Sequence, residues 1–213
     1  MTKFFITLCV AALATVSLTI TGPQLEYIYG AEGSYRSEKP NIDSLNFNAY
    51  FIDRALEYGD MYNSCPRQAA FVAQVLINSC TFKCLGSGEW EGKEYEGRAD
   101  VGNTQPGDGV KYRPRGAFKI VGRNAYKKYG QQLGVDFENH PEWVEQAHWA
   151  YMVAAAVWKE RGNNELADKN NGEDIERAFI SDGLPISQGP GFLQTMKNNV
   201  KRHWSRAKEA LGC

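Results

Sequence analysis

The sequence of 213 residues has almost no net charge, because 24 lysines and arginines nearly balance 25 aspartates and glutamates. It therefore lacks the basic surface, with a pI of about 9 or above, that is typical of nucleic-acid-binding domains. Only three histidines are present, and none is paired with a cysteine at metal-ligand spacing. We expect no nucleic-acid partner and no metal, and nothing in the sequence indicates a cofactor.

The chain also has no internal repeat and no clear strand pattern. Apolar residues instead recur at steps of three and four, as on the buried face of a helix. The predicted fold class is mainly α, and the 43% hydrophobic content is enough for one sizeable core. Residues 85–114 form a glycine-rich, aperiodic loop of a length that is usually functional or disordered. Helices are predicted over 45–58, with Ser44 as the cap, and over 66–79, 123–133, 141–162 and 192–211.

The N-terminus has the pattern of a secretory leader. Lys3 precedes an apolar stretch, and no further charge occurs before Glu26. Cleavage is expected after Ala14 or after Thr21, and the sequence does not choose between them. We expect residues 1–21 to be the leader, 22–43 a mobile linker and 44–213 the domain of a secreted, extracellular protein with no membrane contact. The alternative is a membrane anchor, which the threonines and the serine of the stretch disfavour.

Five cysteines are present, and removal of the leader would take Cys9 with it. Cys65, Cys80, Cys84 and Cys213 remain, and four cysteines in an oxidising compartment predict two disulfides. Three connectivities are possible, and the spacing does not distinguish them. Cys80 and Cys84 can pair with each other only if the chain leaves helical geometry between them.

One long motif is more specific than these patterns. Residues 95–109 are YEGRADVGNTQPGDG, and residues 111–126 are KYRPRGAFKIVGRNAY. This run resembles glycoside hydrolase family 19, the lysozyme-like chitinases and endolysins. Segments 67–74 (RQAAFVAQ), 134–144 (GVDFENHPEWV) and 163–168 (NNELAD) extend the resemblance over about residues 44–183. It implies a lysozyme-like helical domain with a glycine-rich cleft loop, which hydrolyses β-1,4-linked amino-sugar polymers with inversion.

Several polar residues of the motif are suited to holding the loop in shape. Asparagine and aspartate bond to nearby backbone groups in turns, and the arginine fork pins carboxylates or carbonyls. The residues assigned to this structural role are Arg98, Asn103, Asp108, Arg115 and Arg123.

Inverting hydrolysis requires a protonated carboxylic acid and an opposing carboxylate about 6.5–9.5 Å away. The resemblance places the acid in a His-Glu pair at the end of the helix over 66–79, where this chain has Ile77 and Asn78. An amide has no titratable proton near neutral pH, so Asn78 cannot be a general acid. Glu89 is the best candidate for the base; Glu96 is a weaker candidate and is expected to brace the loop through an arginine.

The resemblance also assigns sugar contacts, and most of these positions have changed. Lys119 replaces a glutamine, Val121 replaces a hydroxyl residue that would hold the attacking water, and Ala125 replaces an asparagine. The loop residues match the family, whereas residues at the positions for the reaction and the sugar contacts differ. This combination is the pattern of a pseudoenzyme. The substrate-contact positions in this chain are Tyr112, Lys119, Asn124 and Ser181.

Three functions remain open. The first is a secreted chitinase-like protein that binds chitin or peptidoglycan oligosaccharides with lost or weak catalysis. The second is an active endochitinase or muramidase whose acid is a loop glutamate. The third is a protein-binding effector that uses the basic final helix, with Lys197, Lys201, Arg202, Arg206 and Lys208. The sequence does not distinguish chitin from peptidoglycan.

Overall fold

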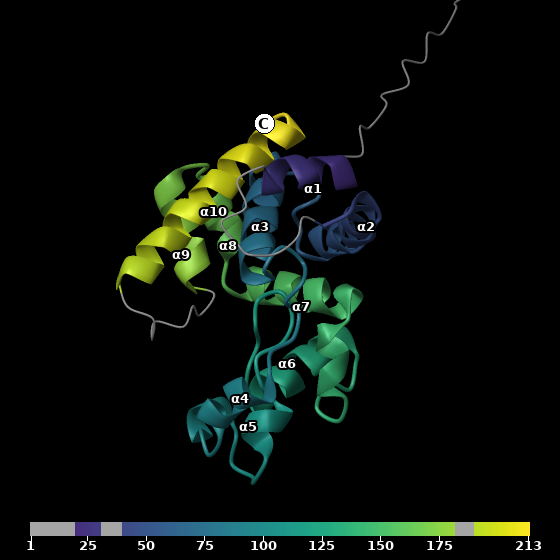
Figure 1. Ribbon diagram of the computed structural model, residues 1–213, viewed down its shortest axis with the longest axis vertical. Helices are drawn as coiled ribbons and strands as arrows, with labels where there is room; N and C mark the ends of the chain where they lie inside the picture. Colours follow the sequence, from purple (N-terminus) through teal and green to yellow (C-terminus); the bar gives the residue numbers. More distant parts are fainter. Residues whose placement is uncertain (1–19, 31–39, 182–189) are drawn as a thin grey trace, which may run out of the picture.

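The computed structural model describes residues 20–30, 40–181 and 190–213, and these fold into helices joined by turns (Figure 1). Within these ranges no strand forms, apart from an isolated antiparallel bridge between Arg115 and Ile120. The predicted mainly α fold class is confirmed. None of the described helices is long and apolar enough to span a membrane.

Helix α3 (Cys65–Asn78) is the centre of the core. Every residue from Gln68 to Ile77 is buried, and three of them are alanines, whose small side chains let neighbouring helices approach closely. In Figure 1, α3 lies between α10 (Pro190–Leu211) and α2 (Ile42–Tyr58), and α7 (Ala147–Glu160) crosses below it. The end of α3 that carries Asn78 therefore faces the junction with the lower part of the molecule.

The predicted helices are present, with two differences in their extent and two helices in addition. Helix α2 begins earlier than expected, because Asn41 and not Ser44 caps it by accepting a hydrogen bond from the Ser44 N–H (2.8 Å). The stretch 141–162 is divided into a 3₁₀ turn η3 (Pro141–Glu145) and α7. Helices α8 (Asn163–Asp168) and α9 (Gly172–Ser181) were not predicted.

The glycine-rich loop is a series of single turns and not an extended segment. These turns lie with α6 (Arg123–Leu133) at the lower end of Figure 1, and loops connect them to the upper helices. Each turn is too short to show helical periodicity, which explains why the sequence indicated only a loop. The turns are α4 (Glu89–Gly92), η1 (Lys93–Tyr95), η2 (Ala99–Val101) and α5 (Asp108–Lys111).

Residues 22–29 correct the expectation of a linker. They form helix α1 (Gly22–Tyr29), which Thr21 and Gln24 cap reciprocally and which packs on α2 and α10. Leu25 and Ile28 are fully buried, and their spacing of three places both on the face that packs into the core. Glycines and prolines around this short apolar pair concealed the helix in the sequence. Residues 1–19 of the expected leader and residues 31–39 lie outside the described part of the chain.

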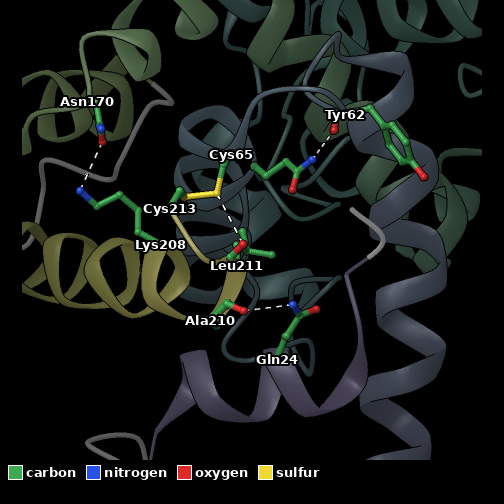
Figure 2. Close-up of a disulfide and its surroundings, with 9 residues drawn as sticks. Gln24, Tyr62, Cys65, Asn170, Lys208, Ala210, Leu211 and Cys213 are labelled. Carbon is green, nitrogen blue, oxygen red and sulfur yellow. Dashed lines mark hydrogen bonds between the residues drawn. A yellow bond between two sulfur atoms is a disulfide. The ribbon is translucent and has the colours of Figure 1, made fainter. Parts of the chain in front are cut away.

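A disulfide joins Cys65, at the start of α3, to Cys213, the last residue of the chain (Figure 2). The two Cα atoms are 5.9 Å apart, and the bond holds the end of α10 against α3. In the same region the Gln24 side chain donates to the Ala210 carbonyl (3.0 Å). One of the two expected disulfides is therefore present, and Cys80 and Cys84 are thiols.

The packing of α1 on α10 predicts a pH-dependent stability. The buried His203 ring on α10 bonds through Nδ1 to the Ile28 carbonyl (3.0 Å), and burial, followed by the charges of Arg202 and Arg206, lowers its pKa below 6.5. The unfolded chain therefore binds this proton more readily, and the free energy of unfolding falls as the pH decreases below about 6.5. Urea unfolding at about pH 7.5 and pH 5.5 measures this fall, which should be smaller in His203→Gln. An equal fall in the variant would contradict the role of His203.

Candidate functional site

The loop scaffold is centred on the buried Asn103 side chain. Its amide donates to the Tyr95 carbonyl (2.9 Å), and its oxygen accepts from the Arg123 N–H (2.9 Å) at the start of α6. Asn103 thus satisfies a free N–H at the helix terminus and joins two segments of the loop. This contact gives Asn103 the structural role expected from the sequence.

An ion pair attaches the same loop to α6. The Arg123 guanidinium contacts the buried Asp108 carboxylate (2.5 Å) and Glu138 (3.1 Å). Burial by itself would raise the pKa of Asp108, but hydrogen bonds from Arg123 and from the Gln105 N–H outweigh it, so the pKa lies below its usual value. Asp108 is therefore ionised at neutral pH and binds Arg123 as a charge pair.

Glu96 braces the loop, but through the backbone and not through the arginine that we expected. Its two carboxylate oxygens accept hydrogen bonds from the Gly107 N–H (2.6 Å) and the Gly109 N–H (2.7 Å). A Cβ atom at position 109 would lie 2.6 Å from the Glu96 nitrogen, so only glycine permits this approach. Both oxygens of the Glu96 carboxylate therefore already accept hydrogen bonds from the loop backbone, which weakens Glu96 as a candidate base.

A second ion pair involves a residue that the sequence analysis missed. Buried Arg115 donates to Glu145 in η3 (2.6 Å), and Arg113 donates to the same oxygen (3.3 Å). Nothing in the sequence signals Glu145, because its partners lie about 30 residues earlier. Arg98, in contrast, pairs with Asp100 at the exposed surface (2.6 Å).

Asn78, the predicted replacement for the general acid, is the last residue of α3 and is half-buried. Its amide makes no hydrogen bond to any part of the chain that the structure describes. Glu89, the candidate base, is the exposed first residue of α4, and the neighbouring Glu91 accepts a bond from the Gly88 N–H (3.3 Å). None of these contacts joins Asn78 or Glu89 to a carboxylate with which it would form a catalytic pair.

Lys119 is directed into the protein and does not extend freely into solvent. Its backbone is left-handed (φ 53°), and its ammonium donates to the Gly86 carbonyl (3.3 Å) and to the Cys84 carbonyl. Burial lowers the pKa of Lys119, and the nearby carboxylates of Glu91 and Glu145 oppose that shift. The position assigned to a sugar contact is thus occupied by a cation that binds the protein's own backbone.

The other predicted substrate contacts differ in accessibility. Tyr112 is fully buried and donates its hydroxyl to the Glu138 carbonyl (3.0 Å), so its assignment as a sugar contact is wrong in this structure. Asn124 is exposed beside Gly102, where an added Cβ would meet its side chain. Ser181 ends α9, and its side chain lies outside the described residues.

The basic face of α10 is largely engaged within the protein. Lys197 and Lys201 pair with Glu176 of α9, and Arg206 donates to the Tyr27 carbonyl (2.8 Å). Among the described residues no group of three histidines, cysteines or carboxylates is arranged to hold a metal ion.

No family model matches the chain. A protein of Haemophilus influenzae described as "Glycosyl hydrolase family 19 domain-containing protein" is 38% identical over 90 residues, which is 42% of each chain. The fold matches a mutant of chitinase C with a TM-score of 0.64 at 14% identity, covering 93% of this chain and 95% of the other. The chain is therefore similar over part of its length to a family 19 protein and has the fold of a family 19 chitinase.

Two further structures support the family 19 chitinase fold. Chitinase C from Streptomyces griseus matches with a TM-score of 0.62 at 15% identity, covering 92% of this chain and 78% of that one. A bacterial family 19 chitinase also gives a TM-score of 0.62, at 18% identity over 89% of this chain and 95% of the other. These identities are low, so the likeness is one of fold. The sequence match itself spans less than half of the Haemophilus protein.

Two aspartate–arginine pairs of the loop provide a matched test of the scaffold. Asp108→Asn leaves Arg123 without its buried carboxylate and should lower the free energy of unfolding by about 2–3 kcal/mol. Asp100→Asn removes an exposed pair and should change it little. Denaturant unfolding of both variants measures the difference, and equal effects would contradict the importance of the Asp108 pair.

Proposed function

We propose that this family 19 chitinase-like protein is secreted and binds β-1,4-linked N-acetylglucosamine polymers with catalysis lost or weak. The observation that carries the proposal is Asn78 at the end of α3, at the position that the family resemblance assigns to the general acid. Loss of proton transfer from an acid costs about 10²- to 10⁴-fold in rate. Secretion is proposed from the leader pattern of the N-terminus.

Lys119 supports the same proposal. Its ammonium lies near the Cys80 thiol, two residues beyond Asn78, and is held by loop carbonyls. We infer that an acid placed at position 78 would lie near this cation, which would favour its ionised form and lower its pKa. An ionised carboxylate cannot donate the proton that the leaving oxygen needs. Position 119 therefore disfavours general-acid chemistry independently of Asn78.

The two positions can be tested together on chitin oligosaccharides. We expect very slow wild-type turnover, no change in Asn78→Ala, and little gain in Asn78→Glu because Lys119 keeps the new carboxyl ionised. Adding Lys119→Gln to Asn78→Glu should increase turnover by at least tenfold over Asn78→Glu alone. Product formation by chromatography measures this series. Rapid wild-type turnover that survives Asn78→Ala would overturn the lost-acid proposal.

Binding without turnover is a separate expectation, and Trp90 is a suitable probe. Its side chain is 68% exposed on α4, next to Glu89, and an exposed indole offers a flat apolar face to a sugar ring. Trp90→Ala should weaken oligosaccharide affinity about tenfold in calorimetric titration. Phe47→Ala is the control, since Phe47 is 58% exposed on α2 and outside the loop. No heat with wild-type protein at millimolar oligosaccharide would contradict binding.

An active hydrolase that uses a loop glutamate is the alternative, and Glu89 is its best candidate because it is exposed and free of the backbone contacts that hold Glu96. Glu89→Gln in the turnover assay separates the two functions. Activity that depends on Glu89 but not on Asn78 would favour the alternative. The effector hypothesis gains no support from α10, because several of its basic side chains already bind the protein itself.

A further inference from the structure

The turn that follows Asn78 has an unusual backbone. Cys80, Thr81 and Phe82 all have positive φ angles (47°, 60° and 68°), although none is glycine. The Cys84 N–H donates to the Ser79 carbonyl (2.8 Å), and the Phe82 N–H donates to the Ser79 hydroxyl (2.9 Å). Consecutive left-handed residues are costly, so the surrounding contacts must hold this turn. The chain thus leaves helical geometry between Cys80 and Cys84, which is the condition for these residues to pair.

The turn brings the two cysteine side chains together. The Cys84 side chain lies within interaction range of the Cys80 thiol, and both side chains are half-buried. Burial, and then the Cys84 partner, raises the pKa of Cys80 to about 12. Cys80 is therefore largely protonated at neutral pH, so its thiolate is scarce and its exchange with a disulfide is slow. The proximity of the two side chains in this turn, and not the acidity of the thiols, is what favours a disulfide between them.

Lys119, a position of the candidate site, contacts the segment that carries Cys80 and Cys84. Its ammonium donates to the carbonyl of Cys84 and to that of Gly86, and it lies close to both thiols. The position of Cys84 therefore affects both the turn after Asn78 and the segment that leads to Glu89 and Trp90.

We propose that Cys80 and Cys84 form an oxidisable pair whose disulfide locks the turn between α3 and α4. In the reaction, the two thiols and one disulfide oxidant, such as oxidised glutathione, exchange to give the Cys80–Cys84 disulfide and two reduced thiols of the oxidant. Two electrons and two protons pass from the protein to the oxidant. The proposal does not depend on carbohydrate binding, and the Cys65–Cys213 disulfide leaves no other cysteine partner in the described chain.

Lys83 makes the bond directly detectable. Trypsin cuts after Arg67, Lys83 and Lys93, so Cys80 and Cys84 fall into separate peptides, 68–83 and 84–93. Full-length protein is treated with oxidised glutathione, alkylated and digested without reduction. Mass spectrometry should then show these peptides joined, with a mass two hydrogens below their sum. Alkylation of both cysteines, a stable glutathione adduct on either, or a link to Cys65 or Cys213 would overturn the proposal.

Serine variants test whether the bond locks the turn. Cys80→Ser and Cys84→Ser keep a small hydrogen-bonding side chain, and in each the remaining cysteine should be alkylated. Hydrogen exchange is then measured in the same oxidising buffer, which keeps the Cys65–Cys213 disulfide intact. The backbone amides of Phe82 and of residue 84 should exchange roughly tenfold more slowly in wild-type protein than in the double serine variant. Equal exchange rates, with the peptide link present, would show that the disulfide does not lock the turn.

Discussion

The burial of α3 from Gln68 to Ile77 is the constraint on which the rest of the structure depends. A helix buried on all sides can be held only by neighbours that close around it, and α7, α8 and α10 pack on α3. One end of α3 is bonded to the C-terminus through Cys65, and the other ends in Asn78 and a left-handed turn. Because the helix is fixed at its start, the position of Asn78 is determined by packing and not by contacts of its own side chain.

The loop beyond α3 has a different source of order. It contains few buried apolar residues and is held by paired charges and by side chains that satisfy backbone groups. These contacts are directional, so each needs its residue at a particular place in the loop. This explains how the motif over 95–109 can persist while nearby positions assigned to the reaction differ. The scaffold and the proposed chemistry depend on different residues.

Sequence patterns predicted the long helices because their apolar faces repeat over several turns. The same approach failed for α1, where two buried residues are too few to show a period, and for the single turns of the loop. At the site, Asn103, Asp108 and Arg123 were predicted because all three belong to the motif between residues 95 and 126. Glu145 was missed because Arg115 reaches it only after folding. Tyr112 was misassigned because a motif gives a residue's position but not whether its side chain is buried.

The changes at positions 78 and 119 are electrostatically consistent with each other. A buried ammonium is costly unless hydrogen-bond acceptors surround it, and Lys119 obtains them from the Cys84 and Gly86 carbonyls. Those carbonyls are available because the left-handed turn directs the chain back toward Lys119. Under the proposal above, the neutral amide of Asn78 is unaffected by this charge, whereas a carboxylic acid near it would tend to ionise. The proposed loss of the acid and the presence of the lysine are therefore compatible, and the turn with Cys80 and Cys84 lies between position 78 and the Cys84 carbonyl that Lys119 binds.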